Sequence, residues 1–182
     1  MDIQKIISLV TKTQGLIKNR EMAAHVKEKG LADYVTQVDI AVQNFLKKEL
    51  FALAPDIQFL GEETGLQEIK ADSFWILDPV DGTTNLMHDY QHSVVSLALC
   101  RQGEIVMGIV YDPFREEVFS AIKGKGSFLN GHPIHVSNAE KLSDTMIGLG
   151  TAKRELADEN FARFCRVFGQ CQDVRRIGSA AL

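Results

Sequence analysis

The sequence predicts a mixed fold, either α+β or layered α/β, built as one domain or a small pair. Two observations predict it. Apolar residues recur at helical spacing in the first third of the chain, and short apolar runs separated by turn residues fill the middle. The 182 residues are 45% hydrophobic and 24% charged, which is typical of a globular chain.

Two helices are expected first. A helical rhythm covers 3–27, with Asp2 positioned to cap it, and a second helix is expected over 40–53. Pro55 would end the second helix because proline cannot continue the hydrogen-bond ladder. The apolar face expected for this helix is formed by Val38, Val42, Phe45, Leu46, Leu50 and Leu53.

Short strands are expected next, at 57–60 and 73–77, and a short helical segment follows Gly82. The four apolar runs that come after are typical of an antiparallel meander, since RQG, DPFR and KGK separate them. Their ranges are 93–100, 104–111, 116–122 and 126–130.

The pattern changes near residue 141. A strand is expected at 145–150 and an amphipathic helix at 158–169, and the final VRRIGSAAL begins a further element. We therefore expect two domains. The first, 1–140, is a complete α+β unit, and the second, 141–182, is only begun.

Several classes of partner and location are not expected. The net charge of −4 provides no basic face, so nucleic acid is not an expected partner. No apolar run approaches the roughly 20 residues that span a bilayer, and the N-terminus lacks a signal-peptide pattern. We expect a cytoplasmic protein with reduced thiols, because its three cysteines form no CxxC pair. His132 and His135 are not expected to bind a metal.

The stretch FWILDPVDGTTN, residues 74–85, contains the most informative chemistry. Its apolar run leads directly into two carboxylates and a proline. Pro79 should end the strand and force a turn, because it lacks a backbone donor. Asp78 and Asp81 would then face one space together with the Val80 carbonyl. Such hard oxygen ligands favour Mg²⁺.

The other side of this turn suits an anion. Gly82 permits a close approach to the backbone, and a helix starting at Thr83 would direct free N–H groups at a phosphate. Further acids, Glu62, Glu63 and Asp39, stand at expected element ends. If all five carboxylates converge, they repel one another without cations, so convergence would itself indicate metals.

Simpler interpretations exist for each acid alone. Asp39 alone is best read as a helix cap, and Glu62 with Glu63 as a solvated loop. Asp112-Pro113 also follows an apolar strand, but no second Asp and no Gly-Thr come after it, so we interpret it as only a turn. The longer DPVDGTT motif is far more specific than any of these.

On these motifs the sequence resembles the inositol monophosphatase family, the lithium-sensitive, Mg²⁺-dependent phosphatases. VTQVD (35–39), GEE (61–63) and WILDPVDGTTN (75–85) stand in the family's order, and GIVYDP, GKGSFLNG and RRIGSAAL extend the likeness. The resemblance implies a layered α-β-α-β-α sandwich of the sugar-phosphatase type and a homodimer.

The resemblance also implies a role for individual residues. The Mg²⁺ ligands would be Glu62, Asp78, the Val80 carbonyl and Asp81, with two or three ions in the family. Glu63 would position a metal-bound water, and Thr83 and Asp39 would form a hydrogen-bonded pair that activates the attacking water. The catalytic residues implied are therefore Asp39, Glu63 and Thr83. The residues that bind phosphate or the rest of the substrate would be Asp81, Gly82, Thr83, Gly178, Ser179 and Ala180.

The activity implied is Mg²⁺-dependent hydrolysis of inositol monophosphate or a similar small polyol phosphate by metal-activated water. A bisphosphate nucleotidase or another sugar phosphatase of the superfamily is an alternative. A haloacid-dehalogenase-type phosphatase fits poorly, because its two acids are two residues apart, whereas Asp78 and Asp81 are three apart. A third alternative is a folded, dimerising module without turnover.

Two departures from the family pattern stand out. The family's lysine before the first motif has two candidates here, Lys27 and Lys29, and neither aligns cleanly. The family's later Trp-Asp motif is absent, since Trp75 is the only tryptophan. We therefore expect a truncated or proteolysed chain, or an abbreviated homologue.

Overall fold

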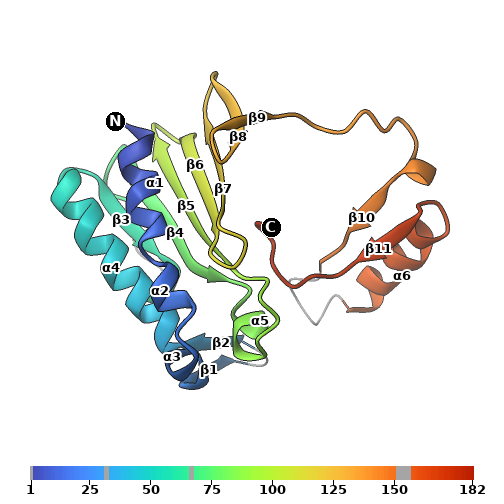
Figure 1. The fold of residues 1–182 in the computed structure, drawn as a ribbon, viewed down its shortest axis with the longest axis horizontal. Helices are drawn as coiled ribbons and strands as arrows, with labels where there is room; N and C mark the ends of the chain where they lie inside the picture. Colours follow the sequence, from blue (N-terminus) through green and yellow to red (C-terminus); the bar gives the residue numbers. More distant parts are fainter. Residues whose placement is uncertain (1, 31–32, 66–67, 151–156) are drawn as a thin grey trace.

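A computed structural model describes residues 2–30, 33–65, 68–150 and 157–182. In these residues, the centre of the fold is a seven-stranded sheet in the order β3-β4-β5-β6-β7-β8-β9 (Figure 1). Strands β3 and β4 run parallel, and all other neighbours are antiparallel. The strands are β3 Gln58–Gly61, β4 Ser73–Asp81, β5 Val94–Arg101, β6 Glu104–Asp112, β7 Glu117–Ile122, β8 Gly126–Leu129 and β9 His132–Ile134. The predicted meander is confirmed, and β9 extends it.

The N-terminal helices cover one face of this sheet (Figure 1). Helix α1 (Ile3–Thr11), α2 (Gln14–Ile17) and α3 (Arg20–Ala24) replace the single helix expected over 3–27, which was wrong. The buried Thr13 hydroxyl donates to the Val10 carbonyl at 2.6 Å, and the Asn19 side chain caps α3. Such side-chain bonds to the backbone compete with the helical ladder and break it into turns.

Helix α4 spans Gln37–Leu53 and starts three residues earlier than predicted. Thr36 is its N-cap, so the helix includes Asp39 in its first turn. It ends before Pro55, as expected. Its buried face is Val38, Val42, Leu46 and Leu50, whereas Leu53 is 40% exposed and was wrongly assigned to that face.

Strand β4 does not stop at Pro79, and that prediction was wrong. Asp78 pairs with Ser96 and Asp81 with Val94, so three steps along β4 match two along β5. The extra residue forms a β-bulge, where a proline without an N–H donor is tolerated. The strand therefore continues through the acidic motif and kinks inside it.

Two further elements flank the motif. The hairpin of β1 (Val26–Gly30) and β2 (Asp33–Thr36) was not predicted, because its exposed, charged β1 lacks an apolar pattern. The short helix α5 (Thr83–Met87) follows Gly82 as expected.

The C-terminal elements form a separate small layer (Figure 1). Strand β10 (Met146–Gly148) pairs in parallel with β11 (Asp173–Arg175), and α6 (Ala157–Phe168) connects them. After β11 the chain turns back toward the seven-stranded sheet (Figure 1). A domain boundary near residue 140 stays a prediction.

The three cysteines, Cys100, Cys165 and Cys171, are free, as expected. Within the described residues, no helix is both long and apolar enough to cross a membrane.

Candidate active site

The bulge in β4 brings the acidic motif to one edge of the sheet. Oδ1 of Asp78 accepts a 3.1 Å hydrogen bond from the Val80 N–H, which holds this carboxylate against the kinked backbone. The Val80 side chain is buried in the core and anchors the bulge from below. Asp81 is the last residue of the strand.

A tight backbone turn connects Asp81 to α5. Gly82 has φ +97°, a conformation that side chains disfavour, and a Cβ there would lie 3.0 Å from the His92 carbonyl. The Ser93 hydroxyl donates to the Gly82 carbonyl at 2.8 Å. The crowding leaves no room for a side chain, and the Ser93 hydrogen bond holds the Gly82 carbonyl in the turn that precedes α5.

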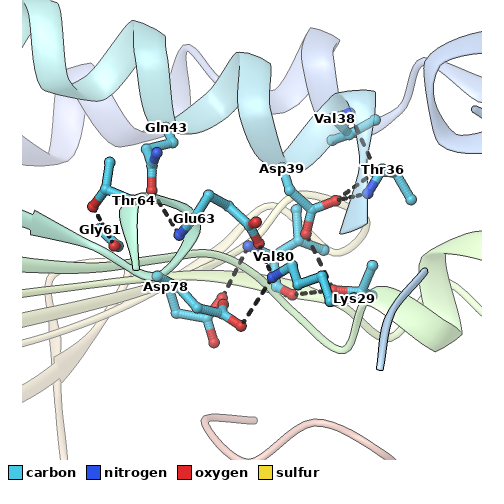
Figure 2. A network of polar contacts seen from close by, with 12 residues as sticks. Lys29, Thr36, Val38, Asp39, Gln43, Gly61, Glu63, Thr64, Asp78 and Val80 are labelled. Atoms are coloured by element: carbon cyan, nitrogen blue, oxygen red, sulfur yellow. Dashed lines mark hydrogen bonds and ion pairs between the residues drawn. The ribbon is translucent and has the colours of Figure 1, made fainter. Parts of the chain in front are cut away.

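Thr83 and Asp39 form a hydrogen-bonded pair, as the resemblance implied. The Thr83 hydroxyl lies 3.1 Å from Oδ1 of Asp39 and 3.0 Å from the Val80 carbonyl. Oδ2 of Asp39 accepts from the Thr36 N–H at 2.8 Å and the Thr36 hydroxyl at 2.5 Å (Figure 2). Asp39 is 1% exposed. It completes the capping box of α4 with the N-cap Thr36 and contacts Thr83 of the acidic motif at the same time.

Glu62 and Glu63 begin a 3-10 turn, Glu62–Thr64, directly after β3. Lys29 of β1 reaches across to them, with its ammonium 2.7 Å from Glu63 Oε1 and 3.7 Å from Glu62 Oε1. Of the two lysine candidates, Lys29 is therefore the one that contacts the GEE motif (Figure 2). Gln43 of α4 accepts a 3.0 Å hydrogen bond from the Glu63 N–H.

The electrostatics of the site are those of crowded carboxylates. Burial, the neighbouring charges of Glu62 and Asp81, and contact with Glu62 raise the pKa of Asp78 to about 8. Burial also raises the pKa of Glu63, although its hydrogen bond to Lys29 opposes the shift. Deprotonating the site is costly unless positive charge is supplied.

The donor chemistry of this edge of the sheet fits Mg²⁺. The donors are all hard oxygens. Burial and then the charges of Glu62 and Asp81 raise the pKa of Asp78, and a bound cation would offset the repulsion among these carboxylates. In the described part of the chain, no group of three or more His, Cys, Asp or Glu side chains is arranged to hold a metal ion. The donor chemistry therefore fits the ion, and the described side chains do not form a finished coordination shell.

We name residues 177–181 the strap, and its last three residues, 179–181, bond Asp81. Oδ2 of Asp81 accepts from the Ser179 hydroxyl at 2.5 Å and the Ala181 N–H at 2.6 Å, and Oδ1 accepts from the Ala180 N–H at 3.1 Å. Two of the predicted substrate residues, Ser179 and Ala180, thus contact one predicted metal ligand. Gly178 lies in the strap beside Asn85, not against Asp81.

Sequence reasoning missed three residues that shape this site: Gln43, Asn85 and Ser93. Asn85 stands within the quoted motif, so its position could have suggested a role. Gln43 is a polar residue on the buried face of α4, which is itself a sign of a specific partner. Ser93 gave no sign in the sequence.

Comparisons with known proteins agree with the motifs. A model described as the inositol monophosphatase family matches residues 2–182. An inositol-1-monophosphatase of Rhizobium meliloti (strain 1021) is 41% identical over 164 residues, 86% of this chain and 60% of that protein. Relatives named Nus factor SuhB also match. This chain spans about 60% of the length of these curated relatives.

Solved structures share the fold. The extragenic suppressor protein suhB of Bartonella henselae gives a TM-score of 0.91 at 31% identity, covering 98% of this chain and 71% of that one. An IMPase/NADP phosphatase complexed with Mg²⁺ and phosphate gives 0.81 at 26% identity, covering 97% of this chain and 67% of that one. The α/β layering therefore matches IMPase structures, and a homologue binds Mg²⁺. The chain belongs to the inositol monophosphatase family.

Proposed function

We propose that this chain is a Mg²⁺-dependent phosphomonoesterase that hydrolyses inositol monophosphate or a similar small polyol phosphate. One observation carries the proposal. The β4 bulge holds Asp78, the Val80 carbonyl and Asp81 within one turn, directly beside the Asp39–Thr83 pair. Oxygen ligands for a cation and a polarised hydroxyl thus share one edge of the sheet.

Glu62, Asp78, Asp81 and the Val80 carbonyl would hold Mg²⁺. When bound, the ion would lower the pKa of a water and neutralise charge on the phosphate and the leaving oxygen. The Glu62 side chain is 51% exposed, so an ion can reach it. The pKa of Asp78 is raised, so a bound cation would stabilise its ionised form.

The Asp39–Thr83 pair would activate the attacking water. Because the Thr83 hydroxyl donates its hydrogen bond to Asp39, the lone pairs of the hydroxyl oxygen remain available to accept a hydrogen bond from water. Thr36 holds the other oxygen of Asp39, so the carboxylate cannot rotate away. Water, not a side chain, would attack phosphorus, and no covalent enzyme intermediate is needed.

Glu63 would position a metal-bound water, and the hydrogen bond from Lys29 holds its carboxylate in place. The backbone N–H groups of Gly82 and Thr83 would hold the phosphate. The strap residues Gly178, Ser179 and Ala180 would contact the rest of the substrate.

The substrate is a small phosphate monoester. A homodimer, a cytoplasmic location and the absence of a nucleic-acid partner remain predictions. The other members of the superfamily considered above, such as a bisphosphate nucleotidase, differ from this proposal in substrate and not in the role of the acidic edge.

The test is phosphate release from inositol 1-phosphate by this 182-residue chain across a Mg²⁺ titration. Asp78→Asn retains the oxygen that bonds the Val80 N–H but removes the charge, and Asp56→Asn, at an exposed position, is the matched control. We expect Mg²⁺-dependent turnover in the natural sequence and the control, and its loss in Asp78→Asn. No turnover at saturating Mg²⁺ would contradict the proposal and favour the folded module without activity.

A further inference from the structure

We propose that Asn85 is a positioning residue that fastens the strap to the turn between β4 and α5. Its side-chain amide nitrogen donates to the His92 carbonyl and to the Ile177 carbonyl, both at 2.7 Å. Asn85 and Ile177 are 92 residues apart in the chain. One amide group thus ties the C-terminal layer to the acidic edge of the sheet.

The contact uses all the donors that the side chain has. An asparagine amide carries two N–H bonds, and each one points at a different carbonyl. An aspartate has the same shape but no donor, so it would face two carbonyl oxygens at hydrogen-bond distance. Asn85 therefore cannot be replaced by its closest isostere without losing the connection.

Gly178, the next residue of the strap after Ile177, also lies against the Asn85 side chain. A Cβ at this glycine would lie 2.9 Å from Asn85 Oδ1, and Gly178 has φ +78°. Both facts require glycine there. The junction thus depends on one residue from each segment, Asn85 of α5 and Gly178 of the strap.

The consequence concerns Asp81. Directly beyond Gly178, the strap supplies Ser179, Ala180 and Ala181, whose donors surround the Asp81 carboxylate. We infer that Asn85 sets the position of these donors without touching Asp81 itself. The effect on the reaction rests on the proposed function, whereas the effect on the strap does not.

The experiment is ¹⁵N relaxation of the backbone amides in the intact chain. For residues 178–181 we expect order parameters near those of a rigid backbone, about 0.85, which fall below about 0.6 in Asn85→Asp. Asn44→Asp introduces the same charge at an exposed position on α4 and should leave these values unchanged. Amides of β5 and β6 report whether the sheet remains intact.

Two outcomes would overturn the proposal. The strap of Asn85→Asp could be as ordered as that of the natural sequence, or the strap of the natural sequence could itself be mobile. If Asn85→Asp fails to fold, Gly178→Ala provides the second test, because it leaves the His92 contact in place. It should mobilise 179–181 with β5 and β6 unchanged, and an ordered strap would again contradict the proposal.

Kinetics then separate this inference from the proposed function. If both hold, Asn85→Asp raises the KM for inositol 1-phosphate more than it lowers kcat. If the relaxation result holds but the natural sequence has no turnover, the positioning role stands and the proposed function fails.

Discussion

The Thr83 hydroxyl donates to one oxygen of Asp39, and the other oxygen of Asp39 caps helix α4. The two explanations of Asp39, helix cap and member of a reactive pair, are therefore compatible. Because the helix start fixes one oxygen, the other has a defined direction toward Thr83. A group placed by secondary structure in this way needs no further reorganisation before it acts.

Removing the Thr83 hydroxyl should abolish the hydrogen bond to Asp39 while leaving the fold largely unchanged. We expect Thr83→Val to lower kcat for inositol 1-phosphate by at least about 10²-fold, the lower range for proton-transfer catalysis. Thr83→Ser should retain most activity because it keeps the hydroxyl. Thr84→Val, at the next and exposed position of α5, is the matched control. Equal activity of Thr83→Val and Thr84→Val would refute the role of the pair.

Thr36→Ala tests whether the N-cap of α4 supports both stability and activity. The variant loses the hydroxyl that accepts from the Val38 N–H and donates to Asp39. We expect the free energy of unfolding to fall by about 0.5–2 kcal/mol, as measured by urea denaturation. Turnover should fall as well, since Asp39 is held less firmly. Thr36→Ser should restore both quantities, and a loss that serine does not reverse would argue against the cap.

Much of the fold could be predicted because periodicity reports burial. The meander strands and α4 follow from apolar residues at spacings of two and of three or four. The broken N-terminal helix could not be predicted in this way. The bond from Thr13 to the Val10 carbonyl depends on the burial of one hydroxyl, which periodicity does not encode.

The site was predicted in composition but not in shape. The acids followed from motifs, and the family resemblance implied that Asp39 pairs with Thr83. The bulge at Pro79 did not, because proline ends a strand in most settings and is tolerated only where the ladder already lacks a bond. Gln43 and Asn85 act through single contacts with distant segments, and such contacts have no local pattern.

Gly61 has a steric role that alanine cannot fulfil. A Cβ there would lie 2.1 Å from Gln43 Oε1, the atom that accepts from the Glu63 N–H. We expect Gly61→Ala to push Gln43 aside and destabilise the chain by about 1–3 kcal/mol, in the range of overpacked cores. Glu63 should also lose its position, so turnover should fall.

Gly108→Ala is the matched control for that substitution. Gly108 is also a strand glycine, in β6, and a Cβ there meets no atom within 4 Å. Chemical denaturation of both variants should show a loss only for Gly61→Ala. Equal stability of the two variants would mean that Gln43 relaxes freely and does not fix Glu63.

When a chelator removes metal ions, the stability of the fold should depend on pH because of the crowded carboxylates. Asp78 has a pKa of about 8 in the folded chain and an ordinary value of 3.8, so the folded state holds this proton more tightly than the unfolded state does. Its stabilising effect is therefore complete below pH 3.8 and is lost as pH rises through about 8. Glu63, whose pKa is also raised, acts in the same direction.

We expect the Tm without Mg²⁺ to fall between pH 5 and pH 8, and Asp78→Asn to show a flatter profile. Added Mg²⁺ should raise the Tm more at pH 8 than at pH 5, because a cation binds the ionised carboxylates and competes with their protons. Thermal unfolding across this pH range, with and without Mg²⁺, measures both effects. A Tm that rises with pH in the chelator, or a Mg²⁺ effect that is larger at pH 5, would show that these carboxylates do not share a cation site.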